Sequence, residues 1–160
     1  MHRKINEAEI EVRFSEVDEM GIAHHSHYLV WCEIGRIHFI ARALDIPFEE
    51  FKKHDIFLPV VKAYGKFYRP VGVGDIIVIR TFCWGPKASM IHFFYEIFKK
   101  ETMVRTSTGL TVHILTNQQR KVMERFPPVL EDKIDEAVKR YPFCFLDFRQ
   151  ARLREKAIVG

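Results

Sequence analysis

The stretch that decides the fold runs from Arg13 to Arg36 and reads RFSEVDEMGIAHHSHYLVWCEIGR. It passes through an acidic turn that contains Gly21, collects three histidines and then becomes a long apolar run with the character of a buried helix. Nowhere else does the sequence place ionisable groups so close to apolar ones. We therefore expect any catalytic chemistry to lie here, with Asp18 as the first candidate.

The segments on either side of the acidic turn predict a strand and a central helix. Residues 8–14 are apolar at every second position, which is typical of a half-buried strand. Residues 28–44 are apolar on nearly every face, so we expect a helix that is enclosed by other structure. Glu33 and Arg36 are three residues apart on that helix and are expected to pair.

The rest of the chain predicts mainly strands, followed by one helix. Runs of β-branched and aromatic residues between turn signals predict strands at 58–68, 76–84, 90–98 and 103–115. Their short connections predict an antiparallel meander, with a bulge or close packing at Gly109. Pro127-Pro128 favours the start of a final amphipathic helix. The segment from Leu146 to Gly160 is mildly basic and shows no periodic core face, so we expect a solvated tail.

The composition limits the classes of protein that this chain can belong to. At 160 residues and 48% hydrophobic content, residues 1–160 are expected to form a single domain with a substantial core. Fourteen phenylalanines and two tryptophans are more aromatic surface than such a domain hides alone, which favours an oligomer. A formal net charge of +4 suits an anionic small molecule and is too weak to indicate nucleic acid.

The N-terminal segment and the cysteines predict where the protein works. The first twelve residues lack the apolar core of a signal peptide, and no window approaches the length of a membrane span. We therefore expect a cytoplasmic protein without integral membrane association. Cys32, Cys83 and Cys144 are odd in number, widely spaced and in apolar surroundings, which predicts buried free thiols rather than disulfides or a zinc site.

The order of one strand, one buried helix and four antiparallel strands predicts an α+β hotdog fold. In this fold a five-stranded antiparallel sheet wraps around a long central helix, here with an added C-terminal helix. The motif R-F-x-E-x-D-x-M-G-I-x-x-H-x-x-Y-L-V-W-x-E-x-G-R strongly resembles the acyl-CoA thioesterases of the 4-hydroxybenzoyl-CoA thioesterase family, in particular the bacterial branch associated with the Tol–Pal system. Later landmarks agree: Tyr68 before Arg69-Pro70, Gly74-Asp75, Tyr95, Gly109 and Arg125-Phe-Pro-Pro128. The resemblance covers residues 7–140 and leaves 141–160 outside as a C-terminal tail.

The resemblance implies hydrolysis of an acyl-CoA thioester by a homodimer or homotetramer of hotdog subunits. No cofactor is implied, because coenzyme A is part of the substrate. Asp18 lies at the family's catalytic carboxylate position, which implies a nucleophile or a general base. His25 lies where this branch carries a histidine near the substrate. The backbone amides from His24 to Ser26, at the start of the central helix, are candidates for an oxyanion hole.

Further residues are expected to bind the substrate or to support the site. Tyr28 is expected to lie in the core or to line an acyl pocket. Lys66, Arg69 and Lys87 are at strand ends where they can meet the phosphates of coenzyme A, although ordinary surface charge explains any one of them as well. Glu16 is expected to be a structural hydrogen-bond partner. Glu33, on the central helix, is the reserve candidate for the catalytic acid.

Three positions depart from the pattern of the family and open a competing interpretation. Val17 stands where threonine is common, His24 where an aromatic residue is usual, and His27 where asparagine often precedes the tyrosine. His24, His25 and His27 with Asp18 and Glu16 could also ligate a divalent metal. We expect no metal, because adjacent histidines do not easily converge on one ion and the enzymes that the sequence resembles are metal-independent.

Two alternatives to hydrolysis stay open at this point. One is a non-catalytic hotdog module that binds an acyl-CoA, although such a module has no need of an acid at Asp18 and commonly carries a DNA-binding segment that this sequence lacks. The other is hydration or dehydration of acyl thioesters, which usually comes with a different helix motif. The sequence does not define the acyl group, nor does it distinguish a dimer from a tetramer.

Overall fold

The computed structural model describes residues 4–160, so residues 1–3 of the predicted single domain lie outside it. The elements follow the chain as β1 (Glu7–Glu11), η1 (Phe14–Glu16), α1 (His25–Arg42), α2 (Phe48–Lys53), β2 (Val60–Phe67), β3 (Ile76–Trp84), β4 (Met90–Lys99), β5 (Val104–Ile114), α3 (Pro128–Arg140), η2 (Pro142–Cys144) and α4 (Phe148–Val159). α1 begins three residues earlier than predicted, because the His24 ring caps the helix and accepts a hydrogen bond from the Ser26 N–H. β1 ends earlier than predicted, because Phe14 begins the 3-10 turn η1.

All five strands form one antiparallel sheet in the order β1-β3-β4-β5-β2. This confirms the predicted α+β hotdog architecture, but the prediction of a meander is right only for β3, β4 and β5. β2 pairs with β5, with Gly65 opposite Gly109. The connection at 68–75 therefore crosses three strand spacings, about 14 Å. Strand propensity and connection length do not encode which strands are neighbours, so the sequence pattern suggested the simpler order.

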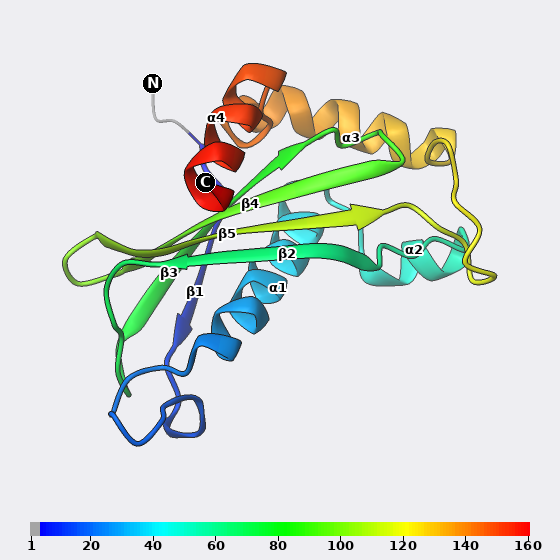
Figure 1. Cartoon of the computed structure of the whole chain (residues 1–160). Coiled ribbons are helices and arrows are strands. Elements are labelled where there is room, and N and C mark those ends of the chain that lie inside the picture. Colours follow the sequence, from blue (N-terminus) through cyan, green and yellow to red (C-terminus); the bar gives the residue numbers. More distant parts are fainter. Residues whose placement is uncertain (1–3) are drawn as a thin grey trace.

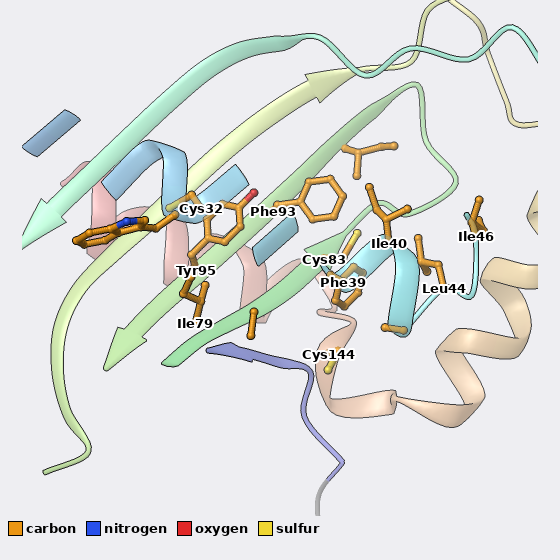
Figure 2. Packing of buried hydrophobic residues seen from close by; sticks show 14 of the residues in the cluster. Cys32, Phe39, Ile40, Leu44, Ile46, Ile79, Cys83, Phe93, Tyr95 and Cys144 are labelled. Atoms are coloured by element: carbon orange, nitrogen blue, oxygen red, sulfur yellow. The ribbon is translucent and has the colours of Figure 1, made fainter. Parts of the chain in front are cut away.

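α1 lies across one face of the sheet, which we call the inner face (Figure 1). Its close approach to β3 depends on Gly35, since a Cβ atom there would lie 2.7 Å from Ile79 Cγ2 and 2.9 Å from Thr81 Oγ1. The helix buries Tyr28, Trp31, Cys32, Gly35, Phe39 and Ile40. These side chains form the main core together with inward-facing residues of the strands, including Ile79, Phe93 and Tyr95 (Figure 2).

One stripe of α1 remains uncovered in the single chain. Leu29, Val30 and Ile37 are exposed. The prediction of a helix enclosed on every face is therefore wrong for one chain, because a five-stranded sheet covers only one side of it. β2 is exposed along its whole length. The exposed part of α1 and β2 is thus unusually apolar for a protein surface.

The three cysteines are buried free thiols, which confirms the prediction from their surroundings. Burial raises the pKa of Cys32 to about 12 and also raises that of Cys83. These thiols therefore stay protonated and behave as small apolar groups. No helix within residues 4–160 is long and apolar enough to cross a membrane.

The C-terminal segment forms a helix, which corrects the prediction of a solvated tail. α4 packs on the face of the sheet opposite α1 (Figure 1), where Ala151 joins Phe82, Phe94, Leu110 and Val112 in a second apolar cluster. Arg154 lies over the Phe82 ring at 4.0 Å and pairs with Glu96 at 2.9 Å. The periodic signal was weak because Ala151 is the buried residue of α4, while the other contacts come from partly buried side chains such as Arg154 and Ile158. A capping box of Asp147 and Gln150 was the missed signal for a helix.

Candidate active site

Asp18 lies in a turn that its own side chain stabilises. The carboxylate Oδ1 accepts a hydrogen bond from the Met20 N–H at 2.9 Å. The Asp18 N–H donates to the Ile22 carbonyl at 3.0 Å, and the Asp18 carbonyl accepts from the Gly21 N–H at 2.9 Å. Oδ2 has no partner among residues 4–160 and is the oxygen that remains available for chemistry.

Glu16 anchors the turn to the start of α1. Its buried carboxylate accepts hydrogen bonds from the Arg13 N–H and guanidinium, each at 2.8 Å, and from Trp31 Nε1 at 3.2 Å. Burial alone would raise the pKa of Glu16, but the bonds from Arg13 and Trp31 outweigh burial and lower it. The Glu16 carbonyl also accepts from the His24 N–H at 2.9 Å. The predicted structural role of Glu16 is confirmed.

The first turn of α1 leaves one amide free at the site. The His24 N–H is used by Glu16, and the Ser26 N–H points to its own cap, His24 Nδ1, at 3.4 Å. No acceptor for the His25 N–H exists among the described residues. Of the three amides predicted for an oxyanion hole, that of His25 is therefore fully available, and it stands at the positive end of the helix dipole.

The Asp18 turn and the start of α1 share one open pocket of about 390 Å³. Four of the predicted site residues line it together: Asp18, His25, Tyr28 and Arg69. The sequence did not identify the remaining wall, which is formed by Met20, Ile22, Ala23, Phe67, Tyr68 and Pro70. The motif Tyr68-Arg69-Pro70 was the available signal, but only the fold shows that the end of β2 faces the Asp18 turn. The pocket thus has a carboxylate and a helix start on one side and aromatic walls on the other.

Two predicted phosphate-binding lysines lie elsewhere. Lys66 is in β2, and its Nζ donates to the Ala157 carbonyl of α4 at 3.1 Å. Lys87 lies in the turn between β3 and β4 and pairs with Asp135 of α3 at 2.7 Å. Neither lysine lines the pocket of Asp18. Only Arg69 of the three basic candidates stands at its mouth.

The reserve acid lies outside the pocket, and the histidine rings before and at the start of α1 contact one another. Glu33 is mostly exposed and lies 3.7 Å from Arg36, which confirms the predicted pair, and it does not line the pocket. The His24 and His25 rings are in contact, with centroids 4.1 Å apart and planes tilted by 38°. Within residues 4–160, no three histidine, cysteine or acidic side chains are grouped so that they could hold a metal ion.

Comparison with known proteins places the chain in a family. The family model of the thioesterase-like superfamily matches residues 12–134 of this chain. "Putative acyl-CoA thioesterase YneP" of Bacillus subtilis (strain 168) is 36% identical over 77 residues, which are 48% of this chain and 55% of that protein. The match therefore spans little more than half the length of YneP.

Two further comparisons cover more of both chains. A 1,4-dihydroxy-2-naphthoyl-CoA hydrolase of Prochlorococcus marinus (strain MIT 9515) is 25% identical over 132 residues, 78% of this chain and 85% of that protein. The crystal structure of a DHNA-CoA thioesterase from Staphylococcus aureus has a TM-score of 0.75 at 23% identity and covers 86% of this chain and 94% of that chain, which shows a shared fold. The superfamily match includes the Asp18 turn, α1 and four of the five strands. The chain belongs to the thioesterase-like superfamily.

Proposed function

We propose that this protein hydrolyses the thioester of an acyl-CoA to a free acid and coenzyme A. One observation carries the proposal: a carboxylate with a free oxygen and a helix start with a free amide line the same pocket. Thioester hydrolysis needs this pair, because a base or nucleophile must act on one side of the carbonyl while a donor stabilises the oxyanion. The names of the relatives, which are thioesterases and CoA-thioester hydrolases, support the same reaction.

The chemistry follows from these groups. Asp18 either attacks the thioester carbonyl, forming an anhydride that water then hydrolyses, or takes a proton from a water that attacks the carbonyl. The His25 N–H donates to the oxygen that becomes negative in the tetrahedral intermediate. When this intermediate collapses, the C–S bond breaks, which yields the anhydride in the first route and the free acid in the second. The thiolate of coenzyme A accepts a proton from the medium or from the His25 side chain. Arg69, at the mouth, is suited to a phosphate of coenzyme A.

Within the superfamily we propose the 4-hydroxybenzoyl-CoA branch associated with the Tol–Pal system, on the motif between Arg13 and Arg36. We also propose a homo-oligomer. β2 is an exposed edge strand with four large apolar side chains at the surface: Val60, Val61, Tyr64 and Phe67. Such an edge is a template for pairing with a second copy. The opposite edge, β1, is short and carries the ion pairs Glu7–Arg80 and Glu9–Lys100, which discourage pairing there.

Replacement of Asp18 by asparagine tests the proposal. Thiol release is followed for wild type and Asp18→Asn across short, long and aromatic acyl-CoA thioesters. We expect a loss of about 100-fold or more in kcat, because the amide can neither attack nor accept the proton of water. Glu33→Gln is the matched control and is expected to keep wild-type turnover, since Glu33 lies outside the pocket.

Two outcomes contradict the proposal in different ways. Retained turnover in Asp18→Asn across the panel removes Asp18 from the mechanism. No turnover of any thioester by wild type, together with measurable binding of an acyl-CoA by calorimetry, favours the non-catalytic binding module instead.

A further inference from the structure

A second cavity of about 120 Å³ lies beneath the first two turns of α1. Its other wall is the inner face of β2 and β5, and its lining includes Leu29, Cys32, Ala63, Gly65, Ser107 and Gly109. We call it the inner cavity. It shares His25, Tyr28 and Phe67 with the Asp18 pocket, so the two spaces adjoin.

Phe67 separates the two spaces. Its ring lies 4.8 Å from that of Tyr28, edge to face, and would be 3.1 Å from a Cβ atom at Gly65. Tyr28 is buried, whereas Phe67 is half exposed and lies on the edge strand. If the carbonyl of a thioester accepts a hydrogen bond from the His25 N–H, its acyl group therefore lies next to the Tyr28 and Phe67 rings and can extend past them into the inner cavity.

Ser107 is a polar group in the inner cavity that the protein itself does not satisfy. Its side chain is 1% exposed, and its hydroxyl has no hydrogen-bond partner among the described residues. The hydroxyls on either side of it in β5 are both bonded: Thr106 donates to the Ile97 carbonyl at 3.1 Å, and Thr108 bonds to Tyr68 at 3.1 Å. An unbonded buried hydroxyl costs stability. Its presence in a cavity wall indicates a polar ligand atom at this position.

We propose that the inner cavity receives the acyl group and that the Ser107 hydroxyl hydrogen-bonds to a hydroxyl or keto oxygen which that group carries. This inference rests on the proposed hydrolysis and names its class of substrate. The inner cavity is about 120 Å³, somewhat less than the roughly 150 Å³ of an enclosed apolar cavity that holds benzene, and it is open where Leu29, Tyr64 and Phe67 are exposed. The preferred acyl group is therefore short or has a single ring, with an oxygen substituent several atoms from the thioester carbonyl.

The test compares acyl-CoA pairs that differ by one hydroxyl: benzoyl-CoA with its ring-hydroxylated isomers, and butyryl-CoA with 3-hydroxybutyryl-CoA. We expect wild type to prefer one or more hydroxylated members. Ser107→Ala should lower kcat/KM for those members about tenfold and leave the unsubstituted partners unchanged, because one hydrogen bond is lost. The same pairs, made as non-hydrolysable thioethers, are titrated by calorimetry and should show the same tenfold change in affinity.

Thr106→Val is the matched control, since it removes the neighbouring hydroxyl, which is already bonded. We expect a lower Tm with unchanged selectivity for Thr106→Val, and an unchanged or higher Tm for Ser107→Ala. A Ser107→Ala variant that keeps the wild-type selectivity in both turnover and binding overturns the inference and leaves only a bound water at Ser107. Selectivity that is seen in binding when no thioester is hydrolysed supports the inference and overturns the hydrolase proposal alone.

Discussion

Polar side chains are buried at both ends of the inner face of β5, but their hydrogen bonding differs between the two ends. At the C-terminal end, His113 Nδ1 donates to the Leu58 carbonyl at 2.9 Å, and Nε2 accepts from the Thr111 hydroxyl at 2.8 Å. Thr111 in turn accepts from the Tyr95 hydroxyl at 2.8 Å. At the other end, Ser107 has no partner among the described residues and borders the inner cavity.

Burial does not distinguish the two ends, because all these groups are buried. The difference is in their hydrogen bonds. The Leu58 carbonyl can only accept, so it fixes the proton on His113 Nδ1 and directs every other bond in the chain of donors. This network joins β4, β5 and the segment before β2, and it stabilises the fold. Ser107 contributes no such bond. The C-terminal end of this strand face therefore stabilises the fold, whereas the Ser107 end is available to bind a ligand.

Removal of His113 should have the largest effect on stability. His113→Ala leaves a cavity. It also leaves the Leu58 carbonyl without its donor and the Thr111 hydroxyl without its acceptor, although Thr111 keeps its bond to Tyr95, so we expect a loss of about 3 kcal/mol or more in the free energy of unfolding. Urea unfolding measures the loss. Ser107→Ala on the same strand face is the control and should stay within about 0.5 kcal/mol of wild type. Equal losses at the two positions would remove the distinction between the two ends.

Low pH should give the next largest loss in the free energy of unfolding, through protonation linked to the hydrogen-bonded His113. Burial lowers the pKa of His113 from 6.5 to about 4, the charge of Arg36 adds to this, and the bond to the Leu58 carbonyl acts in the opposite direction. Because the folded-state pKa lies below the unfolded value, the unfolded chain binds the proton first, and stability falls as the pH falls from about 6.5 to 4. The full loss from this group is about 3 kcal/mol.

The measurement is urea unfolding across this pH range. Burial also lowers the pKa values of His38 and His92, so some dependence on pH should remain without His113. His113→Ala should remove about one proton from the slope of stability against pH. An unchanged slope in this variant would assign the acid sensitivity to other groups.

The sequence predicted those features that are local in the chain. The turn and helix between Arg13 and Arg36 contain their own signals, the acidic turn and the apolar run, although the His24 cap was missed. Its internal contacts, such as Glu16 with Trp31, follow from short chain separations. The position of each strand was predictable for the same reason, because alternation at residues 8–14 and the runs of β-branched and aromatic residues in the other strands each describe a single segment.

Features that depend on distant pairing were not predictable. β2 lies beside β5 rather than β3, and this choice places Phe67 and Arg69 at the Asp18 turn. Lys66 and Lys87 have the right charge for phosphate, but in the fold one contacts α4 and the other α3. Ser107 is one of several small polar residues in β5, and only three-dimensional contacts show that its hydroxyl is unbonded.

Gly109 lies between the two ends of the β5 face and gives the smallest of the expected effects. A Cβ atom there would lie 2.8 Å from Cys32 Sγ and 3.4 Å from Tyr95 Cδ2, which confirms the predicted close packing. Gly109→Ala should therefore destabilise the protein by about 1–2 kcal/mol through overpacking against α1.

The partner of that clash can be removed to test the cause. Cys32→Ala alone should destabilise by leaving a small void, but combined with Gly109→Ala it exchanges one small group for another at nearly constant volume. The double variant should then be more stable than the sum of the two single losses predicts, by about 0.5 kcal/mol or more in a double-mutant cycle. Simple additivity would mean that the backbone of β5, and not Cys32, absorbs the added methyl group. In that case the β5 backbone would shift to accommodate a methyl group at Gly109 more easily than the 2.8 Å distance to Cys32 Sγ indicates.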